Sequence, residues 1–101
     1  MSNSSDIQTI DETTHGAYRI DVDGGDKPAE LTWTARGEAR IADHTFVPPE
    51  ARGQGLAMHL VEKMVADARE QGFKIMPQCS YVAAAFRRHP EWEALRASPG
   101  E

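Results

Sequence analysis

Two glycines and an arginine precede the most regular helical pattern in the chain, within the segment Val47–Ala57 (VPPEARGQGLA). Gly53 and Gly55 have no Cβ, so a ligand can approach their backbone closely and positive φ angles are accessible. A helix that begins here offers free backbone N–H groups and the positive end of its dipole to an anion. Arg52 adds a planar donor group suited to phosphate oxygens. The segment therefore predicts a phosphate-binding junction for a nucleotide-like cofactor, with an ordinary glycine-containing helix start as the structural alternative.

The glycine spacing excludes the two commonest nucleotide-binding fingerprints. No Lys-Ser or Lys-Thr follows the second glycine, as the P-loop requires, and the pattern G-x-G-x-x-G is absent. Arg52-x-x-Gly55-x-Ala57 instead fits the Q/R-x-x-G-x-G/A signature of the GCN5-related N-acetyltransferases (GNATs), in which this loop holds the pyrophosphate of acetyl-CoA. Most of the chain, from about residue 18 to residue 95, resembles the very small GNAT-like proteins. The other blocks that carry this resemblance are His44–Val47 (HTFV), Pro77–Val82 (PQCSYV) and His89–Glu91 (HPE).

The resemblance implies a fold class and an activity. The fold is α+β, the minimal GNAT fold, in which antiparallel strands precede a β-α-β unit with a splayed parallel strand pair and a short C-terminal helix. The pantetheine arm then fills the gap between the splayed strands. The implied activity is transfer of an acetyl group from acetyl-CoA to an amine, on a protein or a small molecule, through a ternary complex. A CoA-binding module without catalysis is the alternative. By the resemblance, Phe46 and Val47 bind acetyl-CoA through their backbone, which pairs with the pantetheine arm as an added strand. The other residues expected to bind it are Arg52, Gly53, Gln54, Gly55, Leu56 and Ala57, with Arg87 as a candidate for the 3′-phosphate.

Cys79, Tyr81 and His44 are the candidates for the chemical step. Larger family members carry Asn-x-x-Ala-x-x-x-Tyr after the strand that follows the long helix, and this tyrosine protonates the departing CoA thiolate. On that spacing Cys79 takes the asparagine place and Phe86 the tyrosine place, so the usual general acid is missing. We therefore predict that Cys79 is an acyl-accepting nucleophile or a proton donor, with Tyr81 or water as the alternative acid. His44 is the candidate general base. A buried structural thiol and a histidine on the far face of the sheet are the alternatives.

A long amphipathic helix must carry the glycine junction. Apolar residues recur every four positions from Leu56, which predicts a helix over about Gln54–Gln71. Gly72 then stands where a left-handed C-terminal residue is favoured. The charged side chains of the segment, Asp67 among them, are expected on the side away from the core.

Strand-like segments precede and follow this helix. They are Gly16–Val22, Leu31–Thr34 and Ala39–Val47 before it and Phe73–Met76 after it, with a turn at Asp23–Asp26 and a second helix at about Tyr81–Arg88. Three antiparallel strands are expected, followed by a right-handed crossover that makes a parallel pair. Residues 1–15 are expected to form a flexible N-terminus with at most a short strand near Ile7–Ile10, and residues 16–101 a single domain.

The composition narrows the class of protein. The chain of 101 residues carries a net charge of −5, which argues against nonspecific binding to nucleic acid. Its first fifty residues hold ten acidic and four basic side chains, so this half is either a solvated face or a surface that attracts a cationic acceptor. One cysteine excludes an internal disulfide, and no metal-ligand spacing is present. With no signal sequence or apolar run of about 18 residues, we expect a cytoplasmic protein, monomeric or weakly dimeric, without metal or membrane.

Overall fold

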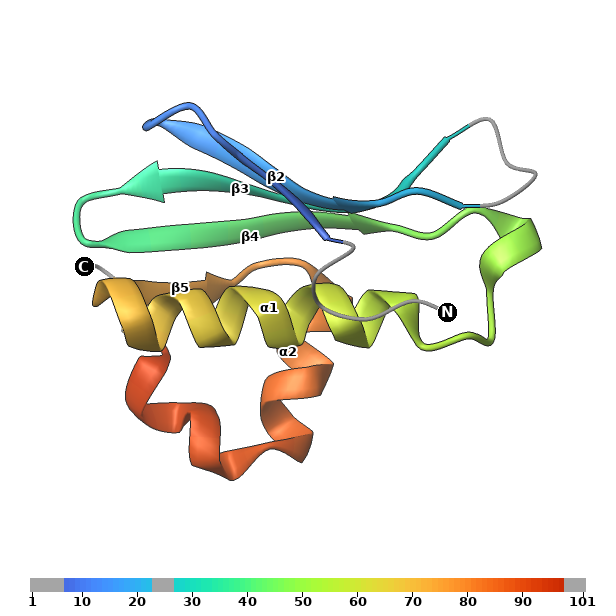
Figure 1. Cartoon of the computed structure of the whole chain (residues 1–101). Coiled ribbons are helices and arrows are strands. Elements are labelled where there is room, and N and C mark those ends of the chain that lie inside the picture. Colours follow the sequence, from blue (N-terminus) through green and yellow to red (C-terminus); the bar gives the residue numbers. More distant parts are fainter. Residues whose placement is uncertain (1–6, 23–26, 98–101) are drawn as a thin grey trace.

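The computed structural model describes residues 7–22 and 27–97, so the turn predicted at Asp23–Asp26 lies outside the described residues. Within them, a five-stranded sheet carries the helices on one of its sides (Figure 1). The α+β class expected from the sequence is confirmed. In chain order the elements are β1 (Gln8–Asp11), β2 (His15–Ile20), β3 (Ala29–Arg36), β4 (Ala39–Phe46), the 3₁₀ turn η2 (Pro49–Ala51), α1 (Leu56–Gln71), β5 (Lys74–Pro77), α2 (Ser80–Arg88) and the 3₁₀ turn η3 (Pro90–Leu95).

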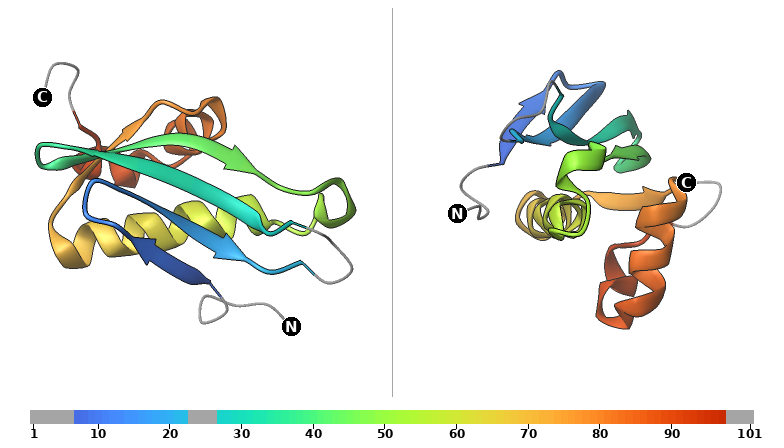
Figure 2. Two further views of the ribbon diagram at one scale, coloured as in Figure 1. Left: turned by 90° about the horizontal axis from the view of Figure 1, so that it is seen from above. Right: turned by 90° about the vertical axis from the view of Figure 1, so that its right-hand side faces the viewer.

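The sheet has the strand order β1-β2-β3-β4-β5. β1 to β4 are antiparallel neighbours, whereas β4 and β5 are parallel. α1 connects the two parallel strands, which is the β-α-β unit predicted from the sequence. This helix runs along the strands on one face of the sheet, as the side view and the view from above show (Figures 1 and 2). The opposite face of the described sheet carries no helix.

α1 supplies the helical side of the core. Its buried residues recur with the spacing that an amphipathic helix requires. They are Leu56, Leu60, Val61, Met64, Val65, Asp67 and Ala68. The apolar members pack in one cluster with Tyr18, Leu31 and Trp33 of the sheet, each of which is almost completely buried. The helix ends at Gly72, whose φ of 83° and N–H bond to Ala68 form the predicted left-handed end.

Asp67 departs from the expected pattern because it faces the core. It is 6% exposed, and its carboxylate accepts hydrogen bonds from the Tyr18 hydroxyl at 3.0 Å and the Lys63 ammonium at 3.1 Å. Burial raises the pKa of Tyr18 well above its ordinary value, and the charge and hydrogen bond of Asp67 add to this effect. The helical charge pattern could not indicate a buried position, since the hydroxyl that makes burial tolerable comes from β2.

The sheet begins ahead of residue 16, the expected start of the domain. β1 pairs antiparallel with β2 and nearly coincides with the short strand expected at Ile7–Ile10. Ile7 packs against the core, and the Thr13 N–H donates to the Asp11 carboxylate at 2.9 Å in the turn between the strands. The three antiparallel strands expected from the sequence are therefore four.

The outer edge of β5 is covered by the segment after η3. The Ala97 N–H donates to the Ile75 carbonyl at 2.7 Å, and Arg96 forms a parallel bridge with Ile75. Trp92 anchors this segment, because its buried ring packs edge-on against Phe86 with ring centroids 5.4 Å apart. Among the helices described, none combines the length and the apolar character that a membrane span needs.

Candidate functional site

β4 and β5 separate beyond Ala42, where their pairing ends. Pro77 is the last paired residue of β5, and a proline has no N–H with which to continue the ladder. The N–H groups of Gln78 and Cys79 both donate to the Ala42 carbonyl, at 3.2 and 2.8 Å. β4 continues to Phe46 while the chain after Cys79 turns into α2, so the two segments diverge. This divergence is the splay that the resemblance implied.

A β-bulge interrupts β4 at the divergence. The register of β4 with β3 skips Asp43, which stands as an extra residue. The hydroxyls of Thr32 and Thr34 both donate to the Asp43 carboxylate, the latter at 2.7 Å. These bonds hold the Asp43 side chain over β3 on the face of the sheet opposite α1.

The bulge determines which of the next two side chains faces the core. Thr45 lies opposite the fully buried Leu31, on the α1 side of the sheet. His44 lies opposite Thr32, on the face that no described helix covers, and is exposed. The predicted base and the side chain next to it in the sequence thus point to opposite faces.

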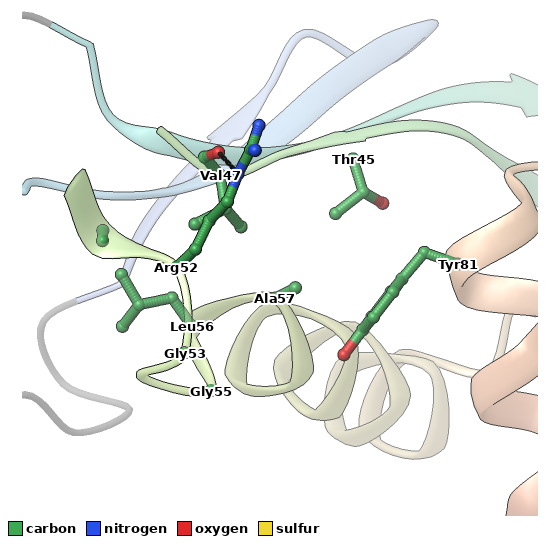
Figure 3. A pocket seen from close by; sticks show the side chains of 9 residues that line it. Thr45, Val47, Arg52, Gly53, Gly55, Leu56, Ala57 and Tyr81 are labelled. Atoms are coloured by element: carbon green, nitrogen blue, oxygen red, sulfur yellow. Dashed lines mark hydrogen bonds between the residues drawn. The ribbon is translucent and has the colours of Figure 1, made fainter. Parts of the chain in front are cut away.

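A pocket of about 370 Å³ lies where the end of β4, the loop before α1 and the start of α2 meet (Figure 3). Arg52 and Tyr81 stand on either side of it. The pocket is lined by Thr45, Val47, Ala51, Arg52, Gly53, Gly55, Leu56, Ala57 and Tyr81. The structure therefore brings most of the predicted acetyl-CoA residues, and the predicted catalytic Tyr81, to one place.

The loop before α1 owes its shape to its glycines. Gly53 has a φ of 88° and Gly55 a φ of 74°, in the left-handed region that disfavours other residues. A Cβ built on either would meet no atom within 4 Å, so backbone conformation and not crowding requires glycine here. The Arg52 Nε donates to the Val47 carbonyl at 3.2 Å, which holds the guanidinium across the loop and against the pocket.

The start of α1 is open to an anion. Gly55 is the N-cap, no side chain caps the helix, and its first turn contains no acidic residue. The first bond of the helical ladder runs from the His59 N–H to the Gly55 carbonyl at 3.1 Å. The N–H groups of Leu56, Ala57 and Met58 therefore lie outside the ladder, next to or within the pocket wall. A bound anion would meet several donors and no carboxylate of that turn.

Cys79 lies beside the pocket at the N-terminus of α2. Its Sγ is 3.3 Å from the Thr45 Oγ1, across the divergence between β4 and the chain after β5. Partial burial raises the pKa of the thiol, but the Thr45 hydroxyl and the backbone N–H groups of Val82, Tyr81 and Thr45 outweigh it. The net pKa of Cys79 lies below its ordinary value.

Phe46, Gln54 and Arg87 were predicted to bind the cofactor but do not line the pocket. Phe46 lies opposite Glu30 in the register, on the face of the sheet away from α1, so only its backbone can act at the divergence. Gln54 is exposed between the two glycines. Arg87 is exposed in the last turn of α2, about 12 Å along the helix axis from Cys79. The structure does not bring Arg87 to the pocket.

Thr45 and Ala51 line the pocket without having been predicted from the sequence. A usable signal existed for Thr45, because side chains two positions apart in a strand share a face and Val47 was already a candidate. Phe86, at the place of the usual tyrosine, is 1% exposed and belongs to the core. Across residues 7–22 and 27–97, His, Cys and carboxylate side chains form no group of three suited to a metal ion.

A family model described as GCN5-related N-acetyl-transferase matches residues 17–95. The chain belongs to the GCN5-related N-acetyltransferase family. The fold of this GNAT chain matches a GCN5-like protein from Staphylococcus aureus, solved by NMR, with a TM-score of 0.69 and 24% identity over 93% of this chain and 91% of that one. The crystal structure of ribosomal-protein-alanine N-acetyltransferase from Brucella melitensis biovar Abortus 2308 matches with a TM-score of 0.52 and 18% identity, over 90% of this chain and 69% of that one. At these identities the two structures establish the GNAT fold alone.

GNATs generally use acetyl-CoA, and the residues of this chain fit that molecule. The uncapped start of α1 and the adjacent Arg52 suit a pyrophosphate. The backbone of β4 beyond Ala42 is without a partner strand among the described residues on its β5 side, which suits an extended pantetheine arm. The thioester end would then lie near Thr45 and Cys79.

Proposed function

We propose that this GNAT is an N-acetyltransferase that moves an acetyl group from acetyl-CoA to an amine in a ternary complex. The observation that carries the proposal is one pocket that joins an uncapped helix start, Arg52 and the β4–β5 divergence, with the Cys79 thiol beside it. The first two features suit a phosphate-bearing cosubstrate, and the last two suit a reacting thioester. The acceptor is a protein amine or a small amine.

Binding of acetyl-CoA follows from the chain's own donors. The N–H groups at the start of α1 and the Arg52 guanidinium hold the pyrophosphate. The backbone of Phe46 and Val47 pairs with the pantetheine arm as an added strand. A backbone N–H at this end of β4 polarises the thioester carbonyl and stabilises the oxyanion that forms when it is attacked.

The environment of Cys79 favours one of its two predicted roles. A lowered thiol pKa makes the thiolate, which is the nucleophilic form, more accessible, so we assign Cys79 as the acyl acceptor. The thiolate attacks the thioester carbonyl, the C–S bond to CoA breaks, and the CoA thiolate leaves with its electron pair. The acceptor amine then attacks acetyl-Cys79 while CoA is still bound, and it loses a proton to the candidate base. The C–S bond to Cys79 breaks, and the Cys79 thiolate leaves with its electron pair. Tyr81, which lines the pocket, is placed to protonate the CoA thiolate.

The acceptor amine approaches from the uncovered face of the sheet. His44 is exposed on that face and is the candidate base for the incoming ammonium. A shallow groove of about 440 Å³ crosses the same face, and its wall includes the carboxylates of Glu12 and Asp43 and the Arg19–Glu30 ion pair. Carboxylates attract a cationic acceptor, such as a lysine side chain, a protein N-terminus or a polyamine. A reducing cytoplasm would keep the Cys79 thiol free for this chemistry.

Release of the CoA thiol, followed over a panel of amines, tests the activity. The panel contains a lysine peptide, a peptide with a free N-terminal amine and spermidine, and amine-dependent release is expected with at least one of them. Cys79→Ala is expected to abolish formation of acetylated protein from acetyl-CoA alone, measured by intact-mass spectrometry. Wild-type turnover in Cys79→Ala would remove Cys79 from the mechanism.

A CoA-binding module without catalysis is the second candidate function. The observation that favours it is the burial of Phe86 in the core at the place where larger family members have the tyrosine acid. Calorimetry together with the thiol-release assay separates the two functions. Acetyl-CoA binding without thiol release for any amine supports the binding module, whereas binding with release supports the transferase.

A further inference from the structure

We propose that Thr45 is a positioning residue, whose hydroxyl holds the Cys79 sulfur at the edge of the pocket. The inference rests on the proposed role of Cys79 as acyl acceptor. Thr45 itself touches the pocket, and it acts on the reaction through the sulfur beside it.

The register of β4 turns the Thr45 side chain toward the core, a direction that it would not have in a strand without a bulge. Ala42 faces α1, so in a strand without a bulge the core-facing positions after it would be residues 44 and 46. The extra residue Asp43 shifts the pattern, and Thr45 faces the core instead. The hydrogen bonds from Thr32 and Thr34 to Asp43 hold the bulge in place from the other face. The bulge therefore delivers the Thr45 hydroxyl to the divergence between β4 and α2.

The contacts of the Cys79 sulfur come from both sides of that divergence. The Thr45 Oγ1 lies 3.3 Å from Sγ on the β4 side. The backbone of Tyr81 and Val82, at the start of α2, and the backbone of Thr45 also lower the pKa of the thiol by hydrogen bonding. β5, the third element at this point, ends in the uncharged pair Met76-Pro77. The titratable group nearest in sequence, Tyr81, belongs to the pocket wall.

The hydroxyl is the contact that a side-chain substitution can remove. A hydroxyl donates to a thiolate and accepts from a thiol, so it holds the sulfur in either protonation state. It also stabilises the thiolate when the proton leaves. Valine has nearly the shape of threonine and lacks this group, whereas serine retains it and lacks only the methyl.

Alkylation of Cys79 by iodoacetamide, followed against pH, tests the proposal. Cys79 is the only cysteine of the chain, so the incorporated label reports this thiol alone. The wild-type rate is expected to reach half its maximum below the ordinary cysteine pKa of about 8.5. Thr45→Val is expected to move this midpoint upward by about one pH unit, and Thr45→Ser is expected to keep it within a few tenths of the wild-type value.

Two outcomes would overturn the proposal. A wild-type midpoint in Thr45→Val would show that the hydroxyl does not act on the sulfur. An equal upward shift in Thr45→Ser would assign the effect to packing of the methyl group. Thermal unfolding is measured for both variants, and their melting temperatures are expected within a few degrees of the wild type. This measurement identifies any variant whose alkylation midpoint reflects loss of folding.

The same variants separate this inference from the proposed function. Alkylation needs no acetyl-CoA, so its midpoint reports the Thr45–Cys79 contact whether or not the protein is an enzyme. If the transferase proposal is right, Thr45→Val also slows acetylation of Cys79 by acetyl-CoA about tenfold at pH 7, and Thr45→Ser does not. A midpoint shift without acetylation in the wild type would reject the transferase and retain the role of Thr45.

Discussion

Arg52 and Arg87 are both exposed arginines with different relations to the pocket. Arg52 lines it and is held by the Val47 carbonyl, whereas Arg87 lies at the far end of α2. A fixed guanidinium loses less freedom when it binds a phosphate than a mobile one does. Arg52 is therefore the arginine on which binding of CoA should depend.

We expect Arg52→Ala to weaken acetyl-CoA binding by about ten- to a hundredfold, because a hydrogen bond to a charged group contributes about 1.5–3 kcal/mol. Calorimetric titration measures the effect, and Arg87→Ala is the matched control with an expected Kd close to that of the wild type. A larger loss in Arg87→Ala than in Arg52→Ala would contradict this placement of the phosphates.

Residue-level prediction succeeded where the backbone dictates the residue type. Gly53 and Gly55 have positive φ angles, as their place before a helix indicated. The burial of Asp67 and the contact between Thr45 and Cys79 were not predicted, since each depends on a partner from a distant segment of the chain. Tyr18 comes to Asp67 from β2, and the bulge at Asp43 turns Thr45 toward Cys79.

The two ends of α1 are built alike, although only one touches the pocket. Gly55 begins the helix with a φ of 74° and Gly72 ends it with a φ of 83°. A Cβ at either position meets open space, so alanine would cost backbone strain alone, about 1–2 kcal/mol. Comparison of alanine variants at the two positions therefore separates the contribution of a glycine to folding from its contribution to ligand binding.

Gly55→Ala and Gly72→Ala are expected to lower the free energy of unfolding by similar amounts, about 1–2 kcal/mol. Only Gly55→Ala should also weaken acetyl-CoA binding, because it disturbs the N–H groups at the start of the helix. Urea unfolding measures the first effect and calorimetry the second. Equal binding by both variants would mean that the ligand does not use this end of α1.

Elements with a strong apolar period were predicted well, and polar ones were not. α1, β5 and α2 fall within two residues of their expected bounds, because buried residues recur in them with a clear spacing. β1 was expected only as a short strand in a flexible segment, since its sequence QTID carries one apolar residue. Pairing with β2 stabilises β1, although the residues of β1 show no clear apolar pattern of their own.

Across the whole molecule, the bond between Tyr18 and Asp67 ties the sheet to α1 over 49 positions of sequence. Burial keeps the Tyr18 hydroxyl protonated in the folded state at pH values where the unfolded chain ionises. The stability contributed by neutral Tyr18 is therefore complete below the ordinary tyrosine pKa of about 10 and declines as the pH rises above it.

Tyr18→Phe is expected to lower the free energy of unfolding by about 1–3 kcal/mol at pH 7, because Asp67 loses a buried donor. Above pH 10 the wild type should lose up to about 1.4 kcal/mol per pH unit relative to the variant, so the difference narrows. Urea titrations of both proteins at pH 7, 10 and 11 measure it. A difference that stays constant over this range would show that Tyr18 ionises equally in both states.

The overall topology followed from few features of the sequence. A strand, a long helix and a second strand required a parallel pair, and the proline at residue 77 marked where that pair would end. The face of the sheet left without a helix could not be foreseen from any local pattern. It depends on which residues the twisted strands turn outward, and on the bulge that exposes His44 there.

Residues 96 and 97 occupy the hydrogen-bonding groups of Ile75 that a further strand would need. Assembly between copies by strand addition is thus blocked on that flank, and β1 is the remaining flank of the described sheet. Two copies joined through β1 would leave no outer strand free, so such growth stops at a closed pair and cannot continue into a fibre.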